Sequence, residues 1–123
     1  MPDAHLTAVP LIDWPVALQR AAGKPELAQE MLLLLIKSLP QSDKQIRQAI
    51  TDNDQQVLLH ALHKLHGACC YTGVPRLKNL LEALETQLKK GASIKLLEPE
   101  LYELDDVIQM LLEADTSMPE QLA

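Results

Sequence analysis

The stretch that decides the fold is His60-Ala61-Leu62-His63-Lys64-Leu65-His66-Gly67-Ala68, near the middle of the 123-residue chain. At about 100° per residue, an α-helix gathers the apolar residues of this region on one side, and these are Leu58, Leu62, Leu65 and Cys69. His63 then points about 150° away from that side and faces water. Gly67 lies one turn further along the same outer strip. Because a glycine inside a helix costs about 1 kcal/mol relative to alanine, we expect Gly67 to give access to His63, with a packing notch as the alternative.

Helical periodicity continues on both sides of this stretch, and no segment alternates with the period of two that marks a strand. A short helix is expected from Asp13 to about Ala22, and Gly23 ends it. Pro25 begins a second helix. Its residues 31–36 are apolar all round, which predicts cover on more than one side.

Proline and capping signals divide the middle of the chain. Pro40 interrupts the second helix, and Ser42 with Gln45 resembles a capping box just after it. We expect one long helix kinked near Pro40, with two shorter helices as the alternative. Asn53 and Gln56 form another capping-box candidate, at the start of the helix that carries the central histidines.

The same signals give the remaining helix boundaries: Thr72 and Gly73 at the end of that helix, Pro75 to Lys89-Lys90-Gly91 for the next, and about Leu96 to Ala114 for the last. We therefore predict an all-α fold, an antiparallel up-down four-helix bundle with a short additional N-terminal helix. The chain is expected to form one domain over residues 1–123, with an ordered core over about 10–115 and loose or frayed ends.

Composition argues against several classes of protein. The longest apolar run, Met31 to Ile36, is far shorter than the roughly 20 residues that cross a bilayer, and the first residues lack the pattern of a signal peptide. We expect a cytoplasmic protein without direct membrane contact. With 17 acidic against 11 basic residues and few aromatic ones, binding of nucleic acid is not expected. Adjacent side chains on a helix diverge, so Cys69 and Cys70 are expected to be reduced thiols.

Several segments together resemble the histidine-containing phosphotransfer (HPt) family: His63-Lys64-Leu65-His66-Gly67-Ala68, Gly73-Val74, Leu77, and Leu80-Leu81-Glu82-Ala83-Leu84-Glu85. The family motif reads roughly His-x-Leu-Lys-Gly-[Ser/Ala], followed about six residues later by Gly-[Ala/Val]-x-x-Leu. The chain looks most like the C-terminal HPt module of hybrid sensor histidine kinases, and the motif-bearing part covers about residues 53–90. It departs from the motif at His66, where the family usually has lysine.

The resemblance implies a phosphorelay intermediate of a two-component signalling system. His63 would accept a phosphoryl group from the aspartate of a receiver domain and pass it to the aspartate of a response regulator. A neutral imidazole is nucleophilic near pH 7, and its phosphorylated form stays reactive enough to pass the group on. Receiver domains are thus the expected partners, and Mg²⁺ is expected on the receiver, with no cofactor bound by this chain.

The chain itself is expected to carry phosphate without generating it, because it has no Gly-rich phosphate loop for ATP. We expect a monomer that is not an enzyme by itself. If the chain is a fragment, the resemblance implies that its parent is a histidine kinase, a transferase, of which this is the cytoplasmic end.

The resemblance also assigns roles around His63. His66, Gly67 and Lys64 are expected to stabilise the phosphoryl group or to give access to it, with Lys64 or Arg76 as other sources of positive charge. A mixed polar and apolar surface is expected to dock the receiver domain, and its members are Gln56, Leu59, His60, Cys70 and Arg76.

Two other functions stay open. One is a metal-binding module built from His60, His63, His66 and Cys70. Because His60 and His66 point about 120° apart and no carboxylate is apparent among them, no metal site is expected. The other is a helical adaptor without phosphotransfer. Labelling by a phosphorylated receiver domain, in an acid-labile and alkali-stable form, distinguishes these readings.

Overall fold

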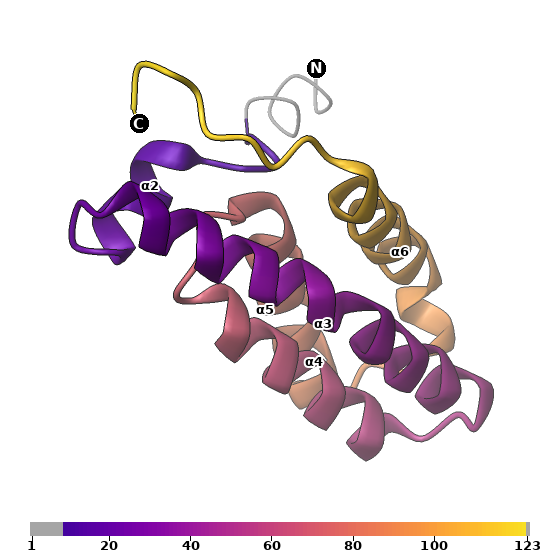
Figure 1. Cartoon of the computed structure of the whole chain (residues 1–123). Coiled ribbons are helices and arrows are strands. Elements are labelled where there is room, and N and C mark those ends of the chain that lie inside the picture. Colours follow the sequence, from indigo (N-terminus) through magenta and orange to yellow (C-terminus); the bar gives the residue numbers. More distant parts are fainter. Residues whose placement is uncertain (1–8, 123) are drawn as a thin grey trace, which may run out of the picture.

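Residues 9–122 are described by the computed structural model, and over that range the chain is helical without a strand. Its elements are α2 (Trp14–Arg20), α3 (Pro25–Thr51), α4 (Gln55–Cys69), α5 (Pro75–Lys89), the 3₁₀ turn η1 (Lys95–Leu97) and α6 (Glu98–Glu113). Helices α3 to α6 pack in chain order, and α6 closes the bundle against α3 (Figure 1). The short α2 packs against α3 at one end. The predicted up-down bundle with an additional N-terminal helix is confirmed.

Helix α2 begins and ends through local chemistry. The backbone N–H of Val16 donates to Asp13 Oδ1 over 3.2 Å, so Asp13 is the expected N-cap. The helix ends at Arg20, two residues earlier than predicted, and the turn that follows places Gly23 at φ +78°. Glycine adopts this left-handed backbone without a steric penalty, and Pro25 then begins α3 as expected.

Helix α3 continues through Pro40, so the single long helix is confirmed and the alternative of two shorter helices is wrong. Ser42 and Gln45 lie inside it and cap nothing. Proline removes one backbone hydrogen bond, but Pro40 is exposed, and burial of the inner face sustains the helix on both sides of it. The buried residues of this face are Ala28, Leu32, Leu35, Leu39, Ile46 and Ala49.

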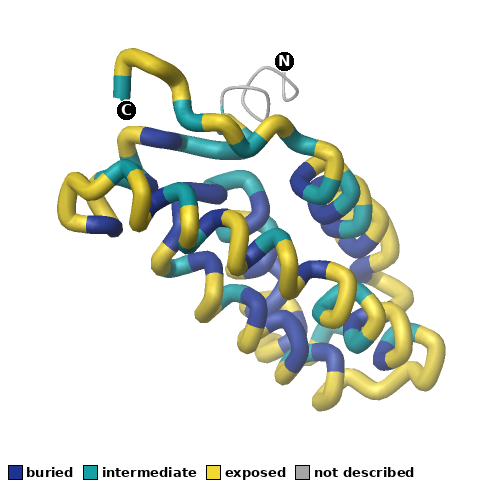
Figure 2. Tube along the Cα trace, in the orientation of Figure 1, coloured by how far each residue is buried: buried dark blue, intermediate teal, exposed yellow. Residues whose placement is uncertain are grey.

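The start of α4 differs by one residue from the prediction. Asp54 is its N-cap, with its Oδ1 accepting from the backbone N–H of Val57 over 3.1 Å, and Asn53 lies outside the helix at φ +51°. Asparagine tolerates the left-handed region, which suits it to the turn before the cap. All α4 residues predicted to face the core are buried, with Ala61 in addition, and Figure 2 shows buried and exposed positions following one another along the helix.

Gly73 does not act as the left-handed stop that was expected at the end of α4. The helix ends earlier, at Cys69, and the glycines with positive φ in the described chain are Gly23 and Gly91. Gly73 instead packs against the start of α2, where its carbonyl accepts from the N–H of Asp13 over 2.8 Å. A Cβ on Gly73 would lie 2.2 Å from the carbonyl oxygen of Asp13, so no side chain fits there.

The last helix was predicted to begin at about Leu96. It begins at Glu98, and Leu96 lies in the 3₁₀ turn just before it. Beyond its end, residues 115–122 run back across the bundle toward α2 (Figure 1). Gln29 Nε2 donates to the Thr116 carbonyl over 3.1 Å, and Met118 and Leu122 are half-buried against the core. These contacts hold the segment against the bundle, while the fraying expected for 115–123 stays a prediction. Residues 1–8 of the expected loose tail, and residue 123, lie outside the described range.

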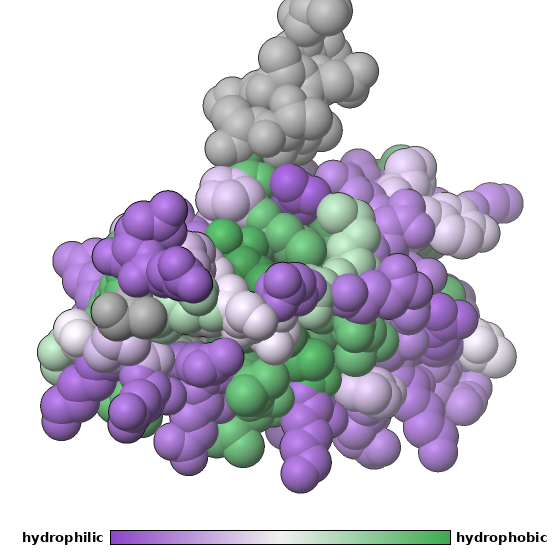
Figure 3. All heavy atoms as spheres, turned by 45° about the horizontal axis from the view of Figure 1, so that its top comes forward, coloured by the Kyte–Doolittle hydropathy of each residue, from purple (hydrophilic) through white to green (hydrophobic). Residues whose placement is uncertain are grey.

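The face that carries the terminal segments keeps apolar residues in view between polar ones (Figure 3). Leu11 and Ile12 of the N-terminal segment are half-buried against the core, as are the C-terminal apolar residues named above. Within the described residues, no helix is both long enough and apolar enough to cross a membrane.

Candidate functional site

His63 lies on the outer face of α4, as the helical phase predicted. Its side chain is 69% exposed, whereas its neighbour Leu62 is completely buried. The buried apolar residues on the inner face attach α4 to the bundle, so the His63 side chain is not needed for packing.

The His63 ring is oriented by a carboxylate from the neighbouring helix. His63 Nδ1 lies 2.7 Å from Glu85 Oε1, and the Glu85 side chain on α5 is only 6% exposed. Glu85 sits beside Leu81, Leu84 and Leu88, which are the residues that α5 buries. An ionised carboxylate only accepts hydrogen bonds, so this contact places the proton of a neutral ring on Nδ1. The lone pair of Nε2 is then unprotonated and available as a nucleophile.

His66 uses the other oxygen of the same carboxylate. Its Nδ1 lies 3.1 Å from Glu85 Oε2, and its Nε2 lies 3.2 Å from Glu82 Oε1. Only a doubly protonated ring donates to both carboxylates at once. The His66 side chain is 20% exposed and contacts two carboxylates of α5, so it connects the two helices.

Glu85 and Glu82 are the site residues that sequence reasoning missed. The expectation that no carboxylate lies among the histidines is wrong, because Glu85 comes from a different helix and contacts two of them. One signal was present in the sequence. Glu85 falls four residues after Leu81 and three before Leu88, and an acidic residue at a core-facing position of a helix needs a partner.

Gly67 leaves the surface beside His63 open. It is exposed, and a Cβ built on it would meet no atom within 4 Å apart from the helix's own backbone and chain neighbours. Gly67 is therefore not a packing notch, and that alternative is wrong. Because Gly67 has no side chain, the surface of α4 one turn beyond His63 is free of projecting atoms.

The other residues predicted to lie on this surface differ in how far they are exposed. Gln56, His60 and Lys64 are exposed, while Leu59 and Cys70 are only half exposed. Leu59 packs against the core, so the outward orientation expected for it holds only in part.

Arg76 is already engaged elsewhere in the fold. Its guanidinium Nε and Nη2 both donate to the carbonyl of Val9, over 3.1 and 2.8 Å. This pairing ties the start of α5 to the N-terminal segment, and it competes with the positive charge that Arg76 was expected to offer at His63.

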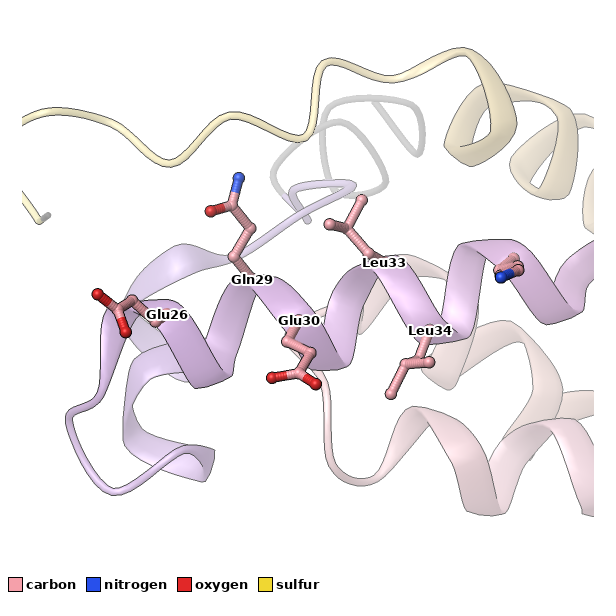
Figure 4. Close-up of a pocket in the computed structure, with 6 residues that line it drawn as sticks. Glu26, Gln29, Glu30, Leu33 and Leu34 are labelled. Atoms are coloured by element: carbon pink, nitrogen blue, oxygen red, sulfur yellow. The ribbon is translucent and has the colours of Figure 1, made fainter.

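The hollow drawn in Figure 4 does not contain His63. Glu26, Gln29, Glu30, Leu33, Leu34 and Lys37 line it, and all of them belong to α3. A second shallow hollow of about 230 Å³ lies between α3 and the end of α4, where Leu34, Ala68 and Tyr71 are among its lining residues. Its lining is largely apolar. The open position of His63 suits a macromolecular partner better than an enclosed small molecule.

The two cysteines are free, as expected, and their surroundings differ. Cys69 is completely buried, and this burial raises the pKa of its thiol to about 12. Cys70 is half exposed, and its Sγ lies 3.5 Å from the carbonyl of His66.

Comparison with known proteins places this arrangement in a family. The sequence model of the Hpt domain matches residues 30–114, which run from the second turn of α3 to the end of α6. A solved structure, the HPT domain from the Hpt sensor hybrid histidine kinase from Shewanella, superposes with a TM-score of 0.78 and 40% sequence identity. That match covers 84% of this chain and 88% of the solved one.

Curated relatives agree with this match. The chain is 44% identical over 95 residues to the signal transduction histidine-protein kinase BarA of Escherichia coli K12, which is 77% of this chain and 10% of the kinase. It is 39% identical over 105 residues to the sensor protein GacS of Pseudomonas syringae pv. syringae, which is 85% of this chain and 11% of that protein. The chain thus spans about a tenth of the length of these relatives, and it belongs to the Hpt domain family.

Proposed function

We propose that His63 is the phosphoryl acceptor and donor of this Hpt domain. The single observation that carries the proposal is the contact between the exposed His63 ring and the buried Glu85 carboxylate. It fixes the ring through Nδ1 and leaves Nε2 directed away from the carboxylate as the nucleophile. As part of a longer sensor kinase, the chain serves as the phosphocarrier, with no ATP site of its own.

The transfer requires little from this chain beyond orientation. The Nε2 lone pair attacks the phosphorus of a receiver's aspartyl phosphate, a P–N bond forms, and the P–O bond to the aspartate breaks to release its carboxylate. The ring gains positive charge as it is phosphorylated, and the Glu85 carboxylate at Nδ1 offsets that charge. The reverse step delivers the group to the aspartate of a response regulator. Mg²⁺ for the transfer is expected on the receiver domain.

The receiver domain is expected to dock on the outer strip of α4. Gly67 lets its phosphorylated loop approach without meeting a side chain, and the exposed Gln56 and His60 flank the histidine. A separate, largely apolar hollow lined by Leu34, Ala68 and Tyr71 lies at the end of α4, on the side of α3. An exposed polar and apolar mixture of this kind is typical of transient protein interfaces.

Positive charge beside the phosphoryl group is assigned to His66 and Lys64. His66 replaces the lysine of the family motif, and its ring has to turn away from Glu82 or Glu85 to reach the phosphoryl group. Lys64 is exposed next to His63 and can swing toward it. Arg76 is the weaker candidate because its guanidinium is bonded to Val9.

The proposal is tested by phosphotransfer from a receiver domain labelled with radioactive phosphate. The wild-type chain is expected to take up label that is labile to acid and stable to alkali, and His63→Gln is expected to take up none. His60→Gln removes another exposed histidine of the same helix and should still take up label, with weaker docking of the receiver as its expected defect. Equal labelling of wild type and His63→Gln would contradict the assignment, and a wild-type chain that binds the receiver without taking up label would favour the adaptor.

Glu85 is proposed as a positioning residue, and its two variants separate orientation from charge. Glu85→Gln keeps an oxygen that accepts from Nδ1, so it should retain part of the transfer rate, whereas Glu85→Leu should lose at least about tenfold. The readout is the single-turnover transfer rate together with the ¹⁵N chemical shifts of the His63 ring, which report its tautomer. An unchanged tautomer in Glu85→Leu would show that the carboxylate does not set it.

A further inference from the structure

Three potential metal ligands converge at one point on the surface between α4 and α5. His63, His66 and Glu85 each offer one ligand atom, and these atoms all lie within 4.8 Å of one another. They come from one turn of α4 and one position on α5, so the helix pair itself holds them together. We propose that this cluster binds a divalent transition metal ion, Zn²⁺ in the first instance, and that the bound ion prevents phosphorylation of His63.

The ligand set and its spacing fit zinc. Two imidazole nitrogens and one glutamate oxygen form a set that zinc uses where a fourth, open position is kept for water. With metal–ligand bonds near 2.0 Å, tetrahedral geometry separates ligand atoms by about 3.3 Å. His63 Nδ1 lies 2.7 Å from one oxygen of Glu85 and His66 Nδ1 lies 3.1 Å from the other, so the carboxylate would rotate to present one oxygen to the ion, or bind it through both.

The surroundings support the same conclusion. A metal-bound histidine usually donates its other ring N–H to a carboxylate, which fixes its tautomer. His66 has this arrangement already, because its Nδ1 faces Glu85 and its Nε2 lies 3.2 Å from Glu82 Oε1. Glu85 is buried and held, while His63 is largely exposed and Gly67 leaves the approach open. The ion would therefore have an entry path and a position for water.

A metal ion bound to His63 would prevent its phosphorylation because it changes the tautomer of the ring. In the metal-free protein the proton of the neutral ring is on Nδ1, where Glu85 accepts it. When Nδ1 binds the ion, that proton moves through solvent to Nε2, and the ring stays neutral. Nε2 then has no lone pair to attack phosphorus.

Zinc binding is tested directly on the whole chain, by titration calorimetry with competition from a chromophoric chelator. We expect one Zn²⁺ per chain. His66→Gln and Glu85→Gln should each weaken the affinity at least about tenfold. His60→Gln and Cys70→Ser are the controls and should leave the affinity unchanged, while circular dichroism verifies that every variant is folded. No binding by the wild type, or a loss in a control as large as in His66→Gln, would overturn the proposal.

The exclusion rests on the proposed function, and a second measurement separates the two. Zn²⁺ should slow labelling of the wild-type chain, and a zinc-selective chelator that leaves Mg²⁺ in place should restore it. In His66→Gln the ratio of labelling rates with and without Zn²⁺ should be close to one, which controls for zinc acting on the receiver. If Zn²⁺ binds but the chain takes up no label at all, the phosphorelay role fails and the metal site stands. Equal slowing in both proteins would overturn the exclusion.

Discussion

The inner and outer faces of the segment from α4 to the following loop differ in burial, even between adjacent residues. Leu62 is buried and its neighbour His63 is exposed; Cys69 is buried and Cys70 is half exposed. Gly73 fits a space that no side chain could share, whereas Gly67 faces open space. One short segment therefore separates stability from function by the direction in which its side chains point. Changes on the inner side should lower the stability of the bundle, and changes on the outer side should mainly alter what binds there.

The largest difference is expected between the two thiols. Alkylation of Cys69 should be slower than that of Cys70 by on the order of 1000-fold, because Cys69 is reached only when the helix bundle opens. Mass spectrometry of the chain after timed iodoacetamide treatment measures both rates. Similar rates would mean that the end of α4 opens locally and that the two faces are not separated there.

The buried thiol also predicts a pH dependence of stability. Burial raises the pKa of Cys69 from 9.0 to about 12, so the unfolded chain loses this proton at lower pH than the folded one. The contribution of Cys69 to stability is therefore complete below about pH 9 and falls as the pH rises toward 12. Urea unfolding of wild type and Cys69→Ala at pH 8 and pH 10.5 should show a smaller difference between the two proteins at the higher pH.

Leu62→Ala tests the inner face next. Removing a fully buried leucine should lower the free energy of unfolding by roughly 2 to 5 kcal/mol, whereas His63→Gln should change it by less than about 0.5 kcal/mol. Chemical denaturation followed by circular dichroism measures both. A comparable loss in the two variants would contradict the separation of the faces.

Gly73→Ala is expected to have an intermediate effect. The added methyl group would lie against the backbone of Asp13 and Ala17, and backbone cannot turn aside as a side chain can. We expect a loss of about 1 to 3 kcal/mol, with α2 displaced from the bundle. Thermal unfolding and amide exchange of residues 14–20 measure the two effects. Unchanged exchange in α2 would show that Gly73 does not position it.

Gly67→Ala should have the smallest effect and the opposite sign. Its methyl group meets nothing beyond its own helix, and alanine favours a helix over glycine by about 1 kcal/mol, so stability should rise by up to that amount. The rate of phosphotransfer should fall only slightly. Gly67→Leu serves as the contrast, because its longer side chain should reduce the transfer rate while the fold is retained. Wild-type transfer by Gly67→Leu would remove the access role of this glycine.

Local patterns in the sequence determined most of the fold. The helical phase of α4, the exposure of His63 and the burial of its inner leucines follow from the spacing of apolar residues within one helix, and each agrees with the structure. The motif around His63, Gly67 and Gly73 was enough to indicate the family. These features depend on residues three or four apart, whose relative directions any α-helix fixes.

The tertiary structure decided what those residues meet. Glu85 contacts His63 from 22 positions further on, and Gly73 meets Asp13 across the bundle. Both contacts depend on how the helices and their connecting segments pack against one another, and the spacing of apolar residues within one helix does not determine that packing. Pro40 remained within α3 for a related reason, because burial on both sides of it outweighs one lost hydrogen bond. The sequence by itself therefore determined which way His63 points, whereas only the packing of α4 against α5 supplied its carboxylate partner.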